Sequence, residues 1–479
     1  MKQSLNVRIT PLRFVERSPP FLYPCCCPHS AAASPMLVYQ RLAQAFAASF
    51  QQVQWVILAY LLAITTLIVS IGRLGNITGR RRLLLAGIAL FTVASVMCGL
   101  APTLWLLIAA RAVQGIGAAV MMALTMAFIG EMVPKAKTGS AMGLLGTMSA
   151  IGTALGPSLG GVLITGLSWR AIFLVNVPLG ILTFLLAHRY LPIDRRAAKI
   201  ERVGFDKVGT VLLALTLAAY ALAVTMGRGN FGPLNMILLL VAVFGVRLFI
   251  LAEAKAASPL IRLAMFRDPV LSACLIMSAL VSTVMMATLV VGPFYLSRAL
   301  GLDAAQVGLT LSVGPLVTAL TGVPAGRLAD RHGAQSTTIV GLLGMIAGFF
   351  MLSMMPTALG VPSYIAPMII ITVSYALFQT ANNTAVMTDV RVDQRGAISG
   401  MLNLSRNLGL ITGASAMGAL FAFASAATDI TTADPGAIAT GMRITFAVAA
   451  LLVVFASQSR LGAVRSQQCS KDDTGVIAL

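Results

Sequence analysis

Charged residues, and acidic ones above all, are scarce in this sequence. Only 10% of the 479 residues carry a charge, and aspartate and glutamate together number 15. In an ordinary soluble domain about a quarter of the residues are charged. Because 58% of this chain is hydrophobic, its apolar surface exceeds what one globular core can bury. The composition excludes a cytosolic enzyme and a secreted disulfide scaffold, and it predicts a protein that crosses a membrane many times.

Groups that support catalysis or bind metals are missing as well. The apolar runs hold no paired carboxylates, and the chain has no Gly-x-x-x-x-Gly-Lys-Ser/Thr loop that would bind ATP. The six cysteines share no spacing that indicates a disulfide framework. Cys25-Cys26-Cys27-Pro-His29 offers ligands that suit zinc or copper, but three adjacent cysteines cannot all point at one ion without strain. We expect no catalytic residue, no metal and no bound cofactor.

Long apolar runs dominate what remains. About thirteen of them approach the roughly 20 residues that a helix needs to cross a bilayer. The alternation of polar and apolar residues that barrel strands require is absent from runs such as 281–291. The predicted fold is all-α and polytopic. The expected spans are 54–71, 83–101, 104–130, 139–164, 172–191, 208–226, 233–252, 271–298, 308–328, 336–355, 362–388, 398–423 and 442–458.

The formal net charge of +19 lies mostly in short loops, so it indicates membrane topology and not a nucleic-acid partner. Alternate loops are rich and poor in basic residues. The poor set holds only Arg170, Arg228, Arg298 and Arg443. Basic loops stay on the cytoplasmic side. We therefore expect a multi-pass protein of the cell (inner or cytoplasmic) membrane, with the carboxyl terminus in the cytoplasm.

An internal repeat predicts one more span than the sequence offers. The segment Gly72-Arg-Leu-Gly-Asn-Ile-Thr-Gly79 recurs as Gly326-Arg-Leu-Ala-Asp-Arg-His-Gly333. The second copy is preceded by an additional helix, 271–298, whereas the equivalent region near 18–45 is rich in proline, which a spanning helix does not tolerate. We expect that the first span is missing or replaced, through truncation, a shifted reading frame or a misplaced start.

Two glycine-containing motifs have spacings that suggest structural roles, one in a turn and one in helix packing. The repeated segment predicts a tight cytoplasmic turn, in which glycine permits the reversal and arginine favours the cytoplasmic face; a plain basic loop is the alternative. Its residues are Gly72, Arg73, Asn76, Gly79, Arg80, Arg81, Gly326, Arg327, Asp330, Arg331 and Gly333. The second motif, in helix 139–164, consists of Gly143, Gly152, Gly156, Pro157, Gly160 and Gly161. Ser149, Gly152, Gly156 and Gly160 share one face, which predicts a close helix–helix approach, and Pro157 predicts a kink.

Polar side chains inside the spans are candidates for a substrate pathway. A charge there is costly unless it is paired or faces a watery cavity. An arginine that extends to the membrane surface, or amides that only bond neighbouring helices, are the alternatives. The candidates are Arg111, Gln114, Gln379, Asn382, Asn383, Asn403, Arg406 and Asn407.

These motifs resemble those of the major facilitator superfamily, and specifically its fourteen-span drug:proton antiporter branch of quaternary-ammonium and multidrug exporters. The resemblance covers about residues 41–460. The segments that carry it are the turn 72–82, the arginine motif 107–119, the antiporter motif 143–161 and the segment 169–180. It implies two helical bundles, two extra central spans, proton-coupled export of amphiphilic or cationic compounds and no cofactor. Whether the protein works with an adaptor or outer-membrane partner protein is not determined by the resemblance.

The chain departs from this family pattern in two respects. Asn76 stands where the family usually has aspartate, as the repeat partner Asp330 does, and the family's first span with its membrane aspartate has no counterpart. A porter of another solute, and a transport-incompetent remnant or sensor, are therefore alternatives. The expected division is an anomalous segment 1–53, a bundle 54–191, linkers with two extra spans 192–270, a bundle 271–460 and a cytoplasmic tail 461–479.

Overall fold

The computed structural model describes residues 42, 44–48, 50–191, 206–225, 232–256, 259–388, 390, 394–425 and 434–476. Within these ranges, the side chains of 50, 51, 76, 154–162, 164, 165, 304, 305, 357 and 459–476 lie outside the description. The expectations for the triple cysteine and the missing first span fall outside the described residues.

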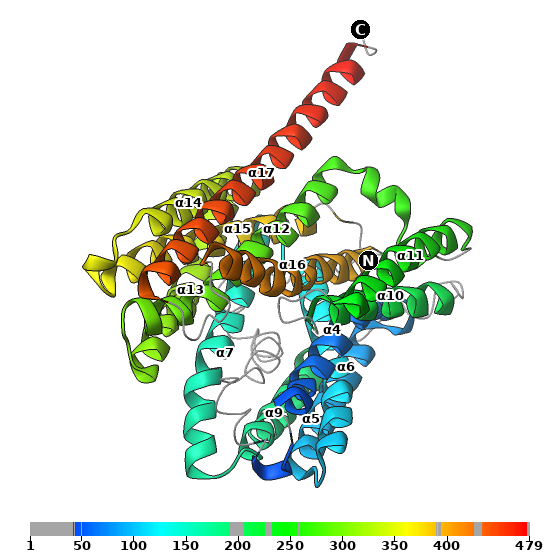
Figure 1. Ribbon diagram of the computed structural model, residues 1–479. Helices are drawn as coiled ribbons and strands as arrows, with labels where there is room; N and C mark the ends of the chain where they lie inside the picture. The colour runs from blue at the N-terminus through cyan, green and yellow to red at the C-terminus, as the bar shows by residue number, and fades with distance from the viewer. Residues whose placement is uncertain are drawn as a thin grey trace.

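Every long regular element in the described part of the chain is an α-helix (Figure 1). The helices are α4 (Phe50–Thr78), α5 (Arg80–Leu100), α6 (Leu104–Met132), α7 (Thr138–Gly166), α8 (Ala171–Leu174), α9 (Asn176–Tyr190), α10 (Lys207–Thr225), α11 (Pro233–Lys255), α12 (Pro269–Phe294), α13 (Ala304–His332), α14 (Ala334–Met354), α15 (Pro362–Thr388), α16 (Arg395–Ala424) and α17 (Pro435–Val476).

All thirteen expected spans fall on these helices, so the predicted all-α fold is confirmed. Twelve stretches of the described residues are long and apolar enough to cross a membrane, and the 29-residue α7 is a further helix at an expected span. The boundaries differ in places. The span 172–191 is divided into α8 and α9, because Pro178 has no N–H for the helical ladder. Helix α17 continues to Val476, through most of the expected tail.

The helices pack as two groups whose largest mutual contacts are two helix pairs, with smaller contacts of α7 with α15 and of α6 with α16. In the first group, α6 packs against α4 and α5, and α5 against α9. In the second, α12 packs against α16 and α17, and α14 against α15 and α17. The groups meet where α7 lies along α13 and where α4 lies along α16 (Figure 1). Helices α10 and α11 pair with each other, and α10 contacts α4 and α16.

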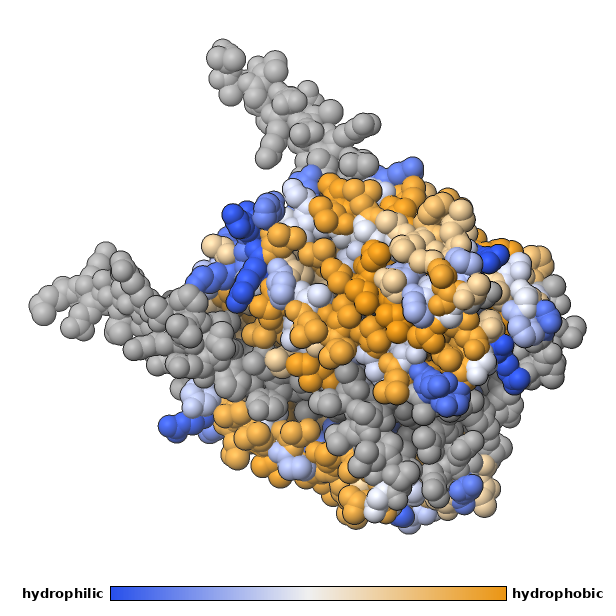
Figure 2. All heavy atoms as spheres, turned by 90° about the vertical axis from the view of Figure 1, so that its left-hand side faces the viewer, coloured by the Kyte–Doolittle hydropathy of each residue, from blue (hydrophilic) through white to orange (hydrophobic). Residues whose placement is uncertain are grey.

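Burial shows which helices are central and which face the surroundings. In α6, 72% of the apolar stretch is buried, against 17% in α11. Figure 2 shows a broad apolar surface on the side of α13 and α14. Its large exposed residues include Leu309, Leu316, Leu320, Val340, Leu343 and Phe350. A water-soluble protein rarely exposes so large a patch, whereas lipid tails solvate it, and this surface is the one expected of a membrane protein.

Candidate functional site

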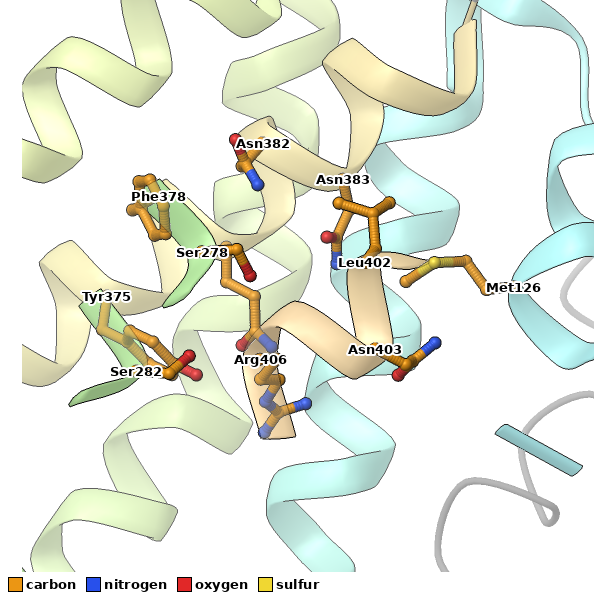
Figure 3. Close-up of a pocket in the computed structure, with 11 residues that line it drawn as sticks. Met126, Ser278, Ser282, Tyr375, Phe378, Asn382, Asn383, Leu402, Asn403 and Arg406 are labelled. Atoms are coloured by element: carbon orange, nitrogen blue, oxygen red, sulfur yellow. The ribbon is translucent and has the colours of Figure 1, made fainter. Parts of the chain in front are cut away.

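A pocket lies where α6, α12, α15 and α16 meet, and its empty space of about 360 Å³ is partly open to the surroundings. Its wall combines amides, hydroxyls and one guanidinium with aromatic and aliphatic side chains (Figure 3). The lining residues are Met126, Ser278, Ser282, Tyr375, Phe378, Gln379, Asn382, Asn383, Leu402, Asn403 and Arg406. Such a mixture is typical of sites for small organic molecules.

Helix α15 supplies most of the polar wall. Tyr375, Gln379, Asn382 and Asn383 recur at intervals of three and four residues, so the helical repeat places them on one side of α15. The Asn382 side chain is 1% exposed, and its Nδ2 donates to the carbonyl of Cys274 at 3.3 Å. Its Oδ1 is buried and accepts no hydrogen bond from the described residues.

Helix α16 contributes the charge of the pocket. Asn403 donates through Nδ2 to the carbonyl of Ser399 at 2.9 Å, one turn earlier. Arg406 lies one turn later on the same face, and its Nε is buried without a hydrogen-bond partner among the described residues. No aspartate or glutamate lines the pocket. The guanidinium therefore gives the pocket a positive charge.

Arg111 and Gln114 form a second polar cluster, which is not part of this pocket. Arg111 donates through Nε to the carbonyl of Val56 at 3.1 Å and through Nη1 to Oε1 of Gln114 at 2.6 Å. Gln114 donates through Nε2 to Ser95 Oγ at 2.8 Å. The guanidinium carbon lies 4.0 Å from the centre of the Tyr60 ring. The cluster joins α4, α5 and α6, and Arg111 is 2% exposed.

The structure thus brings together five of the residues expected in a substrate pathway and separates three. Those that line the pocket are Gln379, Asn382, Asn383, Asn403 and Arg406. Arg111 and Gln114 lie in the separate cluster, and Asn407 is not among the lining residues. The sequence reasoning missed Ser278 and Ser282, whose i, i+4 spacing on an apolar helix was a usable signal. Met126 and Phe378 gave no signal, because apolar residues are everywhere in the spans.

The turn expected at the repeated segment is shorter than predicted, because helices α4 and α13 run almost through it. Within the two repeated segments, only Gly79 and Gly333 have positive φ, at 96° and 84°. Gly72 is helical, and a Cβ on it would lie 2.1 Å from the carbonyl oxygen of Gly396. Close approach of α4 to α16, and not chain reversal, is therefore the role of Gly72. A methyl group there would separate the two helices.

Hydrogen bonds and an ion pair fix the ends of the helices that carry this segment. Asp330 accepts from the backbone N–H of Gly139 at 2.7 Å and of Ser140 at 2.8 Å. These are free donors at the start of α7, where a negative charge is favourable. Arg80 pairs with Glu131 at 2.7 Å. The Asn76 side chain lies outside the described residues, so the effect expected from its missing charge stays a prediction.

The glycine face of α7 packs against α13. A Cβ on Gly143 would lie 2.2 Å from the carbonyl oxygen of Gly322, and a Cβ on Gly326 would lie 2.3 Å from that of Gly139. Gly152 is buried. The side-chain environment of Gly156, Pro157, Gly160 and Gly161 lies outside the described residues. The two helices therefore approach backbone to backbone at the end that carries the repeated segments.

Two helical groups, an apolar outer surface and a polar pocket define a multi-pass membrane protein built to enclose a small solute. The profile of the Major Facilitator Superfamily matches residues 29–414 of the chain. The chain belongs to this superfamily, and it is a transporter and not an enzyme.

Curated relatives share a quarter to a third of their residues with this chain. The Uncharacterized transporter YebQ of Escherichia coli K12 is 34% identical over 75% of this chain and 79% of its own length. The Riboflavin transporter RibZ of Clostridioides difficile 630 is 28% identical over 80% and 82%. The Multidrug resistance protein Stp of Mycobacterium tuberculosis H37Rv is 29% identical over 79% and 70%.

Solved structures share the fold at low sequence identity. The human organic anion transporter MFSD10 (TETRAN) superposes with a TM-score of 0.66 at 14% identity, over 94% of this chain and 100% of its own. The proton:xylose symporter XylE superposes with a TM-score of 0.63 at 16% identity, over 91% and 94%. At these identities the likeness concerns the arrangement of the helices alone.

Proposed function

We propose that this transporter is a secondary active exporter of amphiphilic organic compounds and that the proton gradient drives it. The observation that carries the proposal is the pocket between α6, α12, α15 and α16. Its aromatic and aliphatic side chains suit an apolar body, and its amides and hydroxyls suit a polar group. The name of the relative Stp, a multidrug resistance protein at 29% identity, supports the same function.

We place the chain in the fourteen-span drug:proton antiporter branch, in the cell (inner or cytoplasmic) membrane with the carboxyl terminus in the cytoplasm. The paired helices α10 and α11 support this branch, since they lie between the two groups in the sequence and α10 packs against α4 and α16. Tyr220 on α10 is hydrogen-bonded to Thr412 on α16, and Ser415 donates to the carbonyl of Val224 at 2.5 Å.

A porter of another small solute is the second candidate. The amides of Gln379, Asn382 and Asn383 favour it, because a polar heterocycle would use their donors and acceptors together. The relative RibZ, named a riboflavin transporter, fits the same reading. Competition between riboflavin and an amphiphilic probe for the same export would separate the two candidates.

Efflux of a neutral amphiphile from energised cells tests the proposal. Cells that express the protein are loaded with N-phenylnaphthylamine, and its fluorescence is followed after glucose is added. We expect faster loss of the probe than in cells without the protein, and a return to the background rate when a protonophore is added. Efflux that the protonophore leaves unchanged would refute proton coupling, and efflux at the background rate would refute export of amphiphiles.

A variant in the pocket shows whether this site carries the export. Gln379→Leu removes an amide from the wall and keeps the side-chain size, so we expect slower efflux at equal membrane abundance. The matched control is Arg443→Gln, since Arg443 is exposed and lies outside the pocket. Equal efflux rates for the two variants would move the transport site elsewhere.

A further inference from the structure

Several polar groups of the pocket, which can donate and accept hydrogen bonds, have no partner among the described residues. Among the described residues, the side chains of Gln379, Asn383, Ser278, Ser282 and Tyr375 line the pocket, and no hydrogen bond of theirs to another described group is found. Their polar atoms are not among the fully buried unbonded atoms, so a ligand that enters the pocket can reach them. A ligand rich in acceptor oxygens would satisfy the N–H and O–H donors of these groups.

The charge of Arg406 makes this preference specific. Its Nε is buried and unbonded, and it forms no ion pair within the described part of the chain. The terminal guanidinium nitrogens keep access to the pocket, since neither belongs to the buried unbonded atoms. A guanidinium binds a carboxylate or a sulfonate through two parallel charge-assisted hydrogen bonds. A cationic group in the same pocket would be repelled.

The apolar side chains of the pocket indicate what the uncharged part of the ligand should be. In the view of Figure 3, Tyr375 and Phe378 lie on one side of Arg406, and Met126 and Leu402 lie on the other. Aromatic rings and methionine pack well against a flat aromatic body. The amide oxygens of Gln379 and Asn383, which line the pocket, would accept from an N–H or O–H at the edge of that body.

We propose that the pocket binds amphiphilic aromatic organic acids, with the ligand's anionic group on the Arg406 guanidinium and its ring system between Phe378 and Met126. This inference rests on the proposed export function, because it assigns a substrate class to the same pocket. It differs from the cationic drugs that the sequence resemblance implies. The physical reason is that the lining contains a guanidinium and no carboxylate.

Binding of three probes of one shape tests the assignment. Naphthoate, naphthamide and naphthylmethylammonium differ mainly in charge, and each is titrated calorimetrically into the purified full-length protein at neutral pH. We expect naphthoate to bind about tenfold to a hundredfold more tightly than the ammonium probe, the range of a charge-assisted hydrogen-bonded pair. Equal or tighter binding of naphthylmethylammonium would overturn the inference, as would no binding of naphthoate.

Variants of Arg406 assign the preference to this side chain. Arg406→Gln should lower the affinity for naphthoate about tenfold or more and leave naphthamide binding nearly unchanged, whereas Arg406→Lys should keep part of the preference. The matched control is Arg443→Gln, an exposed arginine outside the pocket. Unchanged naphthoate binding in Arg406→Gln would overturn the assignment. If that variant does not fold, the three-probe comparison on the native protein still decides.

A lipid headgroup is another source of an anionic group, so phosphatidylglycerol is tested as a competitor. We expect it to leave naphthoate binding unchanged, because the two acyl chains of a phospholipid are too bulky for a pocket of this size. Displacement of naphthoate by phosphatidylglycerol, lost in Arg406→Gln, would assign the site to lipid and overturn the inference. All these readouts are binding affinities, so a failure of proton-coupled efflux would refute the proposed function and leave this inference standing.

Discussion

Arg111 is the largest fully buried side chain of the described residues, and it carries a charge. Such a group persists inside a membrane protein only where its donors are satisfied. Here the carbonyl of Val56 and the amide oxygen of Gln114 accept from it, and the face of the Tyr60 ring covers it. Arg111 therefore holds α4 and α6 together, in addition to any contact with substrate.

Replacement of Arg111 should cost stability. Interhelical hydrogen bonds in membranes contribute about 0.6 kcal/mol on average, and a buried cation–π contact contributes about 2 kcal/mol. We expect Arg111→Ala to lower the free energy of unfolding by about 2–4 kcal/mol, measured by titration with sodium dodecyl sulfate. The free energy of unfolding of Arg111→Lys should lie between those of the native protein and Arg111→Ala, because an ammonium does not reproduce the fork of the guanidinium.

The exposed Arg443 provides the control for this experiment. Arg443→Ala should change the free energy of unfolding by no more than about 0.5 kcal/mol. Equal stabilities of Arg111→Ala and Arg443→Ala would contradict a structural role of the cluster. The sequence-based expectation that Arg111 belongs to the substrate pathway stays a prediction: loss of drug resistance in Arg111→Lys at normal abundance would support it.

At the scale of elements, the packing of α7 on α13 depends on glycine at particular positions and not along the whole helix. A Cβ on Gly143 would collide with the backbone of Gly322, whereas a Cβ on Gly146 would meet nothing within 4 Å. The two glycines lie three residues apart on one helix. They form a matched pair for measuring how much close approach stabilises the contact between the two helical groups.

Alanine at these two positions should have opposite effects. Gly146→Ala should leave stability unchanged or raise it by up to about 1 kcal/mol, the difference in helix propensity between alanine and glycine. Gly143→Ala should destabilise, because the new methyl group displaces α13. Thermal unfolding of the purified variants measures both. A melting temperature of Gly143→Ala at or above that of Gly146→Ala would show that α13 shifts to accommodate the methyl group without loss of stability.

The end of α13 also fixes the start of α7 through a carboxylate. Asp330 satisfies two backbone donors there, and caps of this kind contribute about 1 kcal/mol. We expect Asp330→Ala to loosen this end and Asp330→Asn to loosen it less, since the amide keeps one acceptor. Spin labels at the exposed Lys137 and Arg331 should report a broader distance distribution in the alanine variant. An unchanged distribution would show that the glycine contacts suffice.

At the scale of the whole molecule, the distribution of basic residues predicts which ends of the helices face the cytoplasm. Arg298 follows α12, and Arg331 lies near the far end of α13, so the two exposed side chains mark opposite faces of the membrane. The rule that basic loops remain in the cytoplasm places Arg331 inside and Arg298 outside.

Thiol labelling of intact cells measures this orientation. In a protein whose six cysteines are replaced by serine, we expect a membrane-impermeant maleimide to label Arg298→Cys in intact cells and Arg331→Cys only after permeabilisation. The reverse pattern would invert the predicted topology. Labelling of both positions in intact cells would indicate a leaky preparation, which a cytoplasmic marker protein would reveal in the same experiment.

The sequence by itself determined the helices, because a chain with 58% hydrophobic residues and long uninterrupted apolar runs must satisfy its backbone hydrogen bonds within each segment once it lies in lipid. It also determined which polar residues are unusual, since a charge or amide in such a run is conspicuous. Arg406, Gln379 and Asn383 were found in this way. The role of Gly72 was misjudged and that of Gly79 was not, because no local pattern says whether a glycine turns the chain or admits a neighbouring helix.

Only the tertiary structure decided which polar residues share a site. Arg111 and Arg406 look alike in sequence, as single arginines in apolar helices. Yet the first is bonded to Gln114 and the carbonyl of Val56, and the second lines a pocket and has no hydrogen-bond partner in the described part of the chain. The difference arises because the partners come from other helices, distant in the chain, whose approach depends on packing. Helical periodicity fixes the face on which a residue lies, and only the neighbouring helices decide whether that face is closed or open.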